Sequence, residues 1–159
     1  MSDDGTVLVT GATGFVGSVL TRQLVSDGVD VRIFRRERSS LDLLDDAAAA
    51  VDHAVGDVTY ARSLYEAMEG IDRVYHVAAM VRFARRDREA LRRVNADGTA
   101  HVVDAALEAG IDRLVHTSSI AALGRPLGRD RAIDETTPWQ DAPHRSAYAR
   151  SKRRAELEV

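Results

Sequence analysis

The sequence predicts an α/β fold in which a parallel sheet is doubly wound, with helices on both faces. Short apolar runs alternate with segments whose apolar residues recur at helical spacing. Between the first run and the first helical segment, the stretch TGATGFVG, residues 10–17, places three glycines three residues apart. With 159 residues, 45% of them hydrophobic, the chain can bury one core, so we expect one domain over residues 1–159.

The first strand–helix–strand unit is the clearest part of this pattern. Residues 7–9 form an apolar run that reads as a buried strand, and residues 29–34 form the second strand. Residues 15–26 between them carry apolar side chains at helical spacing and end at Asp27-Gly28. The unit spans roughly thirty residues, which is typical of a right-handed parallel crossover.

The same alternation continues to the end of the chain. Further strands are expected over 51–55, 74–77 and 114–117, and further helices over 41–50, 61–68, 88–109 and 147–159. Glycine, proline and charge dominate residues 123–143, which predicts a long functional loop. In such a sheet, ligands bind at the carboxyl ends of the strands, near the switch point.

Composition excludes several classes of function. Because 22 basic residues face 25 acidic ones, the net charge of −3 argues against a general attraction to nucleic acid or anionic membranes. No apolar run approaches the ~20 residues that span a bilayer, and residues 1–6 do not resemble a signal peptide, so we expect a cytoplasmic protein. With no cysteine, redox chemistry requires a bound cofactor.

The glycine-rich turn predicts a dinucleotide site. Amides at a helix N-terminus carry a partial positive charge that suits a diphosphate. We expect Gly11 to permit the tight turn, Gly14 to let backbone approach the ligand, and Gly17 to let helix pack on strand. The same turn also contributes Thr13, Phe15 and Val16 to the predicted cofactor site.

The end of the second strand predicts which dinucleotide binds. A carboxylate there would accept from ribose hydroxyls, whereas arginine would pair with a 2′-phosphate. The sequence is FRRERSS, in which Arg35 and Arg36 precede Glu37. This order favours NADP, and NAD stays open because Glu37 could turn inward.

Two later stretches complete the predicted cofactor site. In GDV, Asp57 could accept from an adenine amino group or could equally cap a helix, and Val58 follows it. In HVAA, Ala78 and Ala79 are small enough to let a cofactor pass over the sheet edge.

A tyrosine and a lysine form the candidate catalytic pair. Tyr148 and Lys152 are four residues apart in a helical segment, so both lie on one face. A nearby ammonium favours phenolate, which makes such a pair a usable general acid/base, and lysine can also bind the nicotinamide ribose. Ser119, at the end of the fifth strand, could donate to a substrate carbonyl or to the tyrosine oxygen.

Together these motifs resemble the extended short-chain dehydrogenase/reductases, the family of NAD(P)-dependent epimerases, dehydratases and reductases with a Rossmann fold. The resemblance covers nearly the whole chain and is closest to the dihydroflavonol reductase-like and hopanoid-associated sugar epimerase-like branches. It implies that Ser119, Tyr148 and Lys152 form the catalytic triad and that Asn95 supports the site. The matching stretches are TGATGFVG, GDV, HVAA, VNADGT, SS and YARSK.

The resemblance also implies a missing part. Family members generally have about twice this length, and their second half supplies further sheet and most of the substrate pocket. We therefore expect a fragment truncated before the substrate domain, or a domain that needs a partner, with strand 114–117 at an incompletely covered edge. Related proteins dimerise through helices equivalent to 88–109 and 147–159, which suggests a homodimer.

Three functions remain open from the sequence. The leading hypothesis is hydride transfer between nicotinamide and a carbonyl or carbinol substrate; a nucleotide-sugar epimerase or dehydratase with tightly held NAD would use the same groups. The third is a dinucleotide-binding module without activity. We expect His76 and His116 to be core or near-core residues rather than metal ligands, and Trp139 to pack over the site mouth or stack on substrate.

Overall fold

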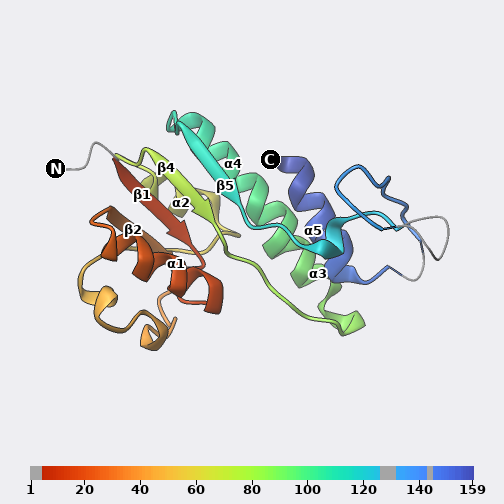
Figure 1. The fold of residues 1–159 in the computed structure, drawn as a ribbon, viewed down its shortest axis with the longest axis horizontal. Coiled ribbons are helices and arrows are strands. Elements are labelled where there is room, and N and C mark those ends of the chain that lie inside the picture. The colour runs from red at the N-terminus through yellow and green to blue at the C-terminus, as the bar shows by residue number, and fades with distance from the viewer. Residues whose placement is uncertain (1–4, 126–131, 143–144) are drawn as a thin grey trace.

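The computed structural model describes residues 5–125, 132–142 and 145–159, and it confirms the doubly wound parallel sheet (Figure 1). The strands run side by side in the order β3-β2-β1-β4-β5, so the chain starts at the centre and builds outward in both directions. All four neighbouring pairs are parallel. The strands are β1 (Thr6–Thr10), β2 (Asp30–Arg35), β3 (Asp52–Val55), β4 (Arg73–His76) and β5 (Arg113–His116).

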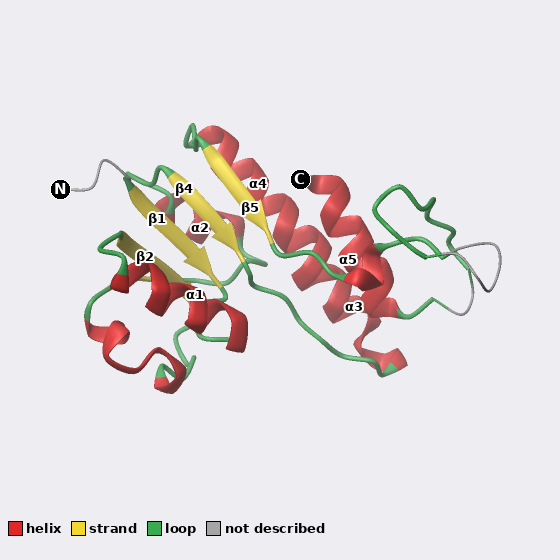
Figure 2. Ribbon diagram, viewed as in Figure 1, coloured by secondary structure: helices red, strands yellow, loops and turns green. Residues whose placement is uncertain are grey.

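Helices cover both faces of this sheet (Figure 2). The described α-helices are α1 (Phe15–Ser26), α2 (Ala61–Ala67), α3 (Arg88–Leu91), α4 (Gly98–Glu108) and α5 (Ala147–Glu158). Helix α1 ends where Asp27-Gly28 was expected to stop it. Helix α5 packs against α4 and the segment before it, beside the sheet rather than on it (Figure 1).

The core forms two layers because successive residues of a strand point to opposite faces. Val7 and Val9 of β1 pack with Ile33 beneath α1. Leu8 points the other way and packs with Val74 against α2 and α4. Because all the strands run parallel and pair up to their last residues, their carboxyl ends lie along one edge of the sheet.

Two predicted helices differ from expectation. The segment expected over 41–50 is a 3-10 element, η1 (Asp42–Ala49), interrupted at Asp45, whose φ of 49° breaks a regular helix. The helix expected over 88–109 contains a π-helical stretch, η3 (Arg92–Asp97), between α3 and α4. A π-turn rotates the following residues relative to the helix axis, and such turns are frequent at functional sites.

The loop expected over 123–143 is described in part, since residues 126–131 and 143 lie outside the described ranges. It is preceded by a short 3-10 turn, η4 (Ile120–Ala122). Farther along, the guanidinium of Arg145 sits 4.2 Å from the centre of the Trp139 ring. This cation–π contact holds the tryptophan to the base of α5.

As expected, β5 forms an edge of the sheet, and the Val115 side chain on it is 44% exposed. Among the described helices, none combines the length and apolar character needed to cross a membrane. Within the same residues, His76 is fully buried and His116 half-buried, and no cluster of histidine or acidic residues could hold a metal ion.

Candidate active site

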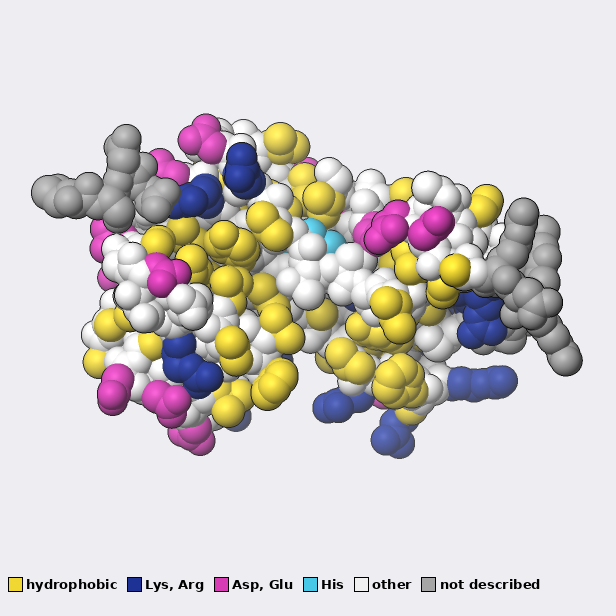
Figure 3. All heavy atoms as spheres, in the orientation of Figure 1, with side chains coloured by type: hydrophobic (Ala, Val, Ile, Leu, Met, Phe, Trp, Pro, Cys, Tyr) yellow, Lys and Arg dark blue, Asp and Glu magenta, His cyan; other side chains and the backbone are white. Residues whose placement is uncertain are grey.

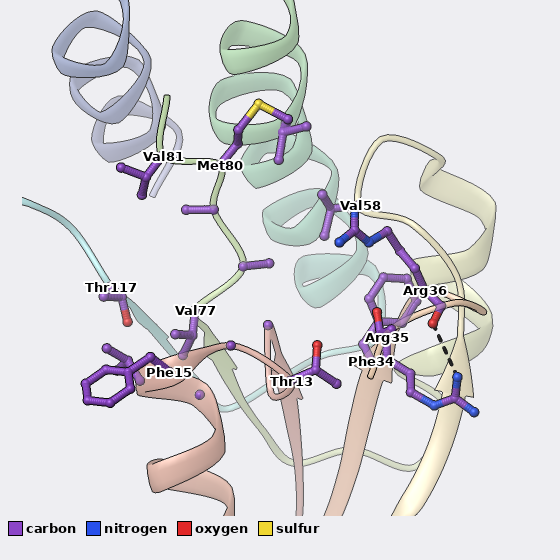
Figure 4. A pocket seen from close by; sticks show the side chains of 18 of the residues that line it. Thr13, Phe15, Phe34, Arg35, Arg36, Val58, Val77, Met80, Val81 and Thr117 are labelled. Atoms are coloured by element: carbon purple, nitrogen blue, oxygen red, sulfur yellow. Dashed lines mark hydrogen bonds between the residues drawn. The ribbon is translucent and has the colours of Figure 1, made fainter. Parts of the chain in front are cut away.

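A cleft of about 670 Å³ lies at the carboxyl edge of the sheet, where the neighbouring strands β1 and β4 end and the segments that follow them lead to opposite halves of the fold (Figure 4). We call it the edge cleft. Every residue predicted to bind the cofactor lines it: Gly11, Thr13, Gly14, Phe15, Val16, Gly17, Arg35, Arg36, Asp57, Val58, Ala78, Ala79, Tyr148 and Lys152.

The glycine turn forms one wall of the edge cleft. Gly11 has a φ of 71°, and a Cβ there would lie 2.6 Å from the amide nitrogen of Ala78. A Cβ on Gly17 would lie 2.1 Å from the Gly11 carbonyl oxygen, so only glycine lets α1 pack this closely. Gly14 differs, because its Cβ would meet only that same oxygen at 3.3 Å. No other described atom lies within 4 Å of this Cβ position, and Gly14 lines the cleft, so the space that a side chain would fill is open to a ligand.

Helix α1 begins without the groups that usually occupy a helix N-terminus. Its N-cap, Gly14, supplies no side chain, and the first turn holds no acidic residue. The leading amides of a helix have no partner within the helix, and they carry the positive end of its dipole. The wall therefore offers backbone donors to an anion.

Arg35 and Arg36 diverge from the end of β2 (Figure 4). The Arg35 guanidinium donates to His53 Nδ1 at 2.9 Å and to the carbonyls of Arg36 and Glu37, which holds it against β3. The Arg36 side chain extends instead toward Val58 (Figure 4), and no described residue hydrogen-bonds its guanidinium. Arg36 thus offers a cation to a ligand at this end of the cleft, while Glu37 does not line the cleft.

Asp57 lies at the end of β3 and has a local partner. Its Oδ1 accepts from the Thr59 amide at 2.9 Å and from the Thr59 hydroxyl at 2.7 Å. This Asx-type turn leads the chain into α2. The residue still lines the edge cleft, so its second oxygen is the one that a ligand could meet.

Lys152 occupies the opposite end of the cleft and is 2% exposed. Its Nζ donates to the Thr117 carbonyl oxygen at 2.7 Å and lies 3.2 Å from His116 Nε2. Burial lowers the pKa of Lys152, and the nearby Glu156 carboxylate partly opposes this shift. Lys152 is also the only lysine in the sequence, against 21 arginines, so the chain uses lysine where a compact ammonium must be buried.

Tyr148 lies one turn before Lys152 on α5 and is partly exposed. The edge of Phe83 packs against its ring, with 5.9 Å between centroids. Phe83 is itself 76% exposed, and Phe15, on the glycine side of the cleft, is 80% exposed. Figure 3 shows hydrophobic side chains bordering the notch between the α1 side of the molecule and the α3–α5 side.

The two serines after β5 have different surroundings. Ser118 lines the edge cleft and donates to Glu156 Oε1 on α5. Ser119, the predicted catalytic serine, lies outside the cleft lining, and its Oγ accepts from the Ala121 amide at 3.1 Å. Among the described residues, no hydrogen bond joins it to Tyr148.

Asn95 joins α5 to the loop that follows β4. It sits 1% exposed on η3, where its Oδ1 accepts from the Met80 amide and its Nδ2 donates to the Met80 carbonyl. The second Nδ2 hydrogen goes to Ser151 Oγ at 2.9 Å, and Ser151 in turn donates to the Tyr148 carbonyl. Asn95 thereby fixes α5 relative to the loop after β4.

His76 extends this network to the glycine side. Ala78 donates to Thr10 Oγ1, which lies 2.7 Å from His76 Nδ1. Thr99 donates its one hydroxyl hydrogen to the Asn95 carbonyl, so it accepts from His76 Nε2, 2.9 Å away. The proton of His76 is therefore on Nε2. Burial lowers the pKa of His76 to about 3, which keeps the ring neutral.

Sequence reasoning missed part of the lining. Most of the missed residues adjoin predicted ones, and the signal that could have found them is their position directly at a strand end. They are Phe34, Ser39, Gly56, Val77, Met80, Val81, Arg82, Val94, Thr117 and Ser118.

The sheet order, the glycine turn and the cleft that reaches Tyr148 and Lys152 define the extended short-chain dehydrogenase/reductase class. The sequence model of the 3-beta hydroxysteroid dehydrogenase/isomerase family matches residues 8–159. The chain therefore belongs to this family, whose members are enzymes.

Two curated relatives show how much of such a protein the chain represents. It is 40% identical to the "Sterol demethylase protein B" of Methylococcus capsulatus, over 97% of this chain and 46% of the relative. It is 41% identical to the "Putative dihydroflavonol 4-reductase" of a Synechocystis strain, over 95% of this chain and 43% of the relative. The chain thus spans about half the length of the curated relatives it matches.

Solved structures also match this chain over about half of their own length. The crystal structure of gox2253 superposes with a TM-score of 0.86 at 39% identity, covering 99% of this chain and 46% of that one. The Bordetella bronchiseptica enzyme WbmG, solved in complex with NAD, superposes with a TM-score of 0.80 at 25% identity, covering 99% of this chain and 49% of that one. WbmG has also been solved with NAD and UDP together.

Proposed function

We propose that residues 1–159 form the dinucleotide-binding domain of an NAD(P)-dependent oxidoreductase, with Tyr148 as the general acid/base. One observation carries this proposal: a single cleft runs from the glycine turn at Gly11 to Tyr148 and Lys152. Such a cleft brings a bound dinucleotide and a proton-transferring side chain together. The substrate is a small carbonyl compound or alcohol.

The edge cleft fits a dinucleotide on its own chemistry. The uncapped N-terminus of α1 and the open side of Gly14 suit a diphosphate. Ala78 and Ala79 leave room along the sheet edge, and Asp57 and Val58 border the far end, where an adenine would sit. These residues would hold the cofactor, while Lys152 would bind the ribose next to the nicotinamide.

The cofactor we propose is NADP in preference to NAD. Arg36 is exposed, lines the cleft and has a guanidinium with no described partner, so it can pair with a 2′-phosphate. Arg35 would support this role indirectly, since its guanidinium braces the backbone of Arg36 and Glu37. NAD remains the alternative, in line with the NAD complex of WbmG.

The bound nicotinamide would supply the hydride acceptor or donor. Tyr148 would exchange a proton with the substrate oxygen through its hydroxyl. Lys152 would face this hydroxyl with a buried positive charge, which stabilises the phenolate form. Ser119 lies outside the cleft lining but directly after Ser118, which lines it, and we keep its predicted role. Its hydroxyl hydrogen would donate to the substrate oxygen, since the bond from Ala121 uses only a lone pair of Oγ.

A second candidate is a nucleotide-sugar epimerase or dehydratase that holds NAD tightly. The WbmG complex with NAD and UDP favours this alternative, because that enzyme has been solved with a dinucleotide and a uridine nucleotide together. Release of reduced cofactor into solution during turnover would count against a self-contained epimerase cycle. A third candidate, a binding module without activity, predicts binding but no turnover.

We also propose a homodimer through the predicted helical segments 88–109 and 147–159. The described parts of these segments pack together through α4 and α5. Leu107 on α4 and Leu157 on α5 are 76% and 68% exposed. Light scattering on the chain and on its Leu107→Glu variant would test this: a dimer that the variant dissociates supports it, and a monomer contradicts it.

The experiment that tests the oxidoreductase is replacement of the phenol. The chain is offered carbonyl compounds, alcohols and nucleotide sugars with NADP or NADPH, and the absorbance of reduced nicotinamide is followed. Tyr148→Phe should lower turnover by about a thousandfold, because general acid/base catalysis typically contributes ~10²–10⁴. Its cofactor affinity should stay near the original value.

Tyr65→Phe is the matched control, since Tyr65 lies on α2 outside the cleft lining and should change nothing. Turnover retained in Tyr148→Phe would remove this residue from the acid/base role. Binding without any turnover would favour the module.

A further inference from the structure

The ammonium of Lys152 is held entirely by neutral acceptors. Its Nζ contacts the Thr117 carbonyl oxygen at 2.7 Å and His116 Nε2 at 3.2 Å. In the described part of the chain, no carboxylate lies within ion-pair distance of this nitrogen. A buried charge without a counter-ion is costly, so its surroundings need an explanation.

The contact fixes the tautomer of His116. An ammonium only donates, so Nε2 must accept, and the proton of the neutral ring is on Nδ1. Nδ1 is buried and finds no hydrogen-bond partner among the described residues. The ring therefore leaves one polar atom unsatisfied while it presents Nε2 to Lys152.

Three titratable groups face this ring. His76 lies opposite in the β4–β5 register, with 5.2 Å between ring centroids, and Lys152 and Glu156 face it from α5. Burial first and the Lys152 charge second lower the pKa of His116 to about 4. At neutral pH the ring is thus uncharged and can accept.

We propose that His116 is a positioning residue for Lys152. With the Thr117 carbonyl it takes two of the three ammonium hydrogens and leaves the third directed at the edge cleft. Because it is neutral, it orients the ammonium without cancelling its charge. A carboxylate at this position would orient Lys152 equally well but would weaken its field at Tyr148. The consequence for catalysis rests on the proposed function; the hydrogen bond itself does not.

The test uses the fact that the chain has one lysine. With ¹³Cε-labelled lysine, NMR gives a single side-chain signal whose pH titration reports Lys152 directly. His116→Gln keeps an acceptor at the ε position, His116→Phe keeps the ring shape without an acceptor, and His116→Glu adds a charge.

We expect an ordered set of lysine pKa values. The glutamine variant should titrate with the original chain, and the phenylalanine variant about one unit lower, because the ammonium loses a charge-assisted hydrogen bond. The glutamate variant should titrate about one to three units higher, since an opposite charge favours the ammonium. If the phenylalanine variant does not fold, the difference in lysine pKa between the glutamate and glutamine variants tests the proposal.

Lysine signals that titrate alike in all folded variants would overturn the proposal, since a purely structural histidine would leave the lysine pKa unchanged. The titration needs neither cofactor nor turnover, so its failure is distinct from failure of the proposed function. For catalysis, kcat should fall about tenfold in the phenylalanine variant and stay within about twofold in the glutamine variant. Equal losses in both would contradict the positioning role.

Discussion

The two ends of the edge cleft are built in different ways. At the glycine end, Gly11, Gly14 and Gly17 shape the wall by having no side chains, and the donors are backbone amides. At the proposed catalytic end, the buried Lys152 and the half-buried His116 contact each other, and the buried Nδ1 of His116 has no hydrogen-bond partner among the described residues. The glycine end depends on the absence of side chains, whereas the other end depends on polar side chains whose burial opposes folding.

Mutations at the two ends should therefore affect stability and function differently. Removing atoms at the catalytic end should cost activity and spare the fold, because buried uncompensated charge opposes folding. Adding atoms at the glycine end should damage the fold or the ligand site, depending on which way the missing Cβ points.

The largest effect should come from Lys152→Met. Turnover should fall by at least about a hundredfold, as expected for loss of a group that supports general acid/base catalysis. The free energy of unfolding should stay equal or rise: burial lowers the pKa of Lys152, so the ammonium form is less favoured in the folded state than in the unfolded one. Steady-state kinetics and urea denaturation measure the two effects, and a loss of stability would contradict the contrast.

Next in size is Gly17→Ala. The added Cβ would lie 2.1 Å from a backbone oxygen that cannot swing aside, so the free energy of unfolding should fall by about 3 kcal/mol. Gly14→Ala is the matched control, three residues earlier in the same turn. Its Cβ meets nothing closer than 3.3 Å, so its unfolding free energy should stay within about 1 kcal/mol of the original. Equal losses in the two variants would show that the turn is not packed as described.

A smaller effect is expected from Arg36→Ala. The variant should bind NADP about tenfold more weakly and leave NAD affinity nearly unchanged, since only NADP carries a phosphate for this guanidinium. Arg38→Ala, at an exposed position outside the cleft lining, should change neither affinity. Fluorescence titration with both dinucleotides measures this, and equal losses for NADP and NAD would remove the proposed preference.

The last prediction concerns pH. The pKa of His76 is lowered from 6.5 to about 3, and that of His116 from 6.5 to about 4. Below pH 6.5, both histidines are therefore protonated more readily in the unfolded chain than in the folded one. Stability should therefore fall as pH falls, by roughly 1.4 kcal/mol per pH unit for each histidine in this window. His116→Gln should remove the contribution of one histidine to this pH dependence of stability between pH 6.5 and about 4. An unchanged slope in urea denaturation would show that His116 is not held neutral by the fold.

Much of the fold could be predicted because local signals agreed with one another. The bounds of α1 follow from helical spacing and a glycine stop, and the cofactor lining follows from strand ends that a parallel sheet must bring to one edge. The strand predicted over 114–117 was also expected at an edge, and β5 lies at one end of the described strand order.

The rest depends on tertiary contacts. The π-turn in η3 has no pattern of its own; it arises where Asn95 reaches both Met80 and Ser151. Likewise, Ser118 rather than Ser119 lines the cleft because the chain turns after β5, which residue spacing does not reveal. The contact between His116 and Lys152 joins residues 36 apart in the sequence.

The most direct test of the account is calorimetric titration of NADP and NAD into the chain and into its Gly14→Ala variant. The account predicts saturable one-to-one binding, tighter for NADP than for NAD and weakened at least about tenfold in the variant, because a methyl group there blocks close approach of the diphosphate. Absence of binding by both dinucleotides, or affinities unchanged in the variant, would contradict it.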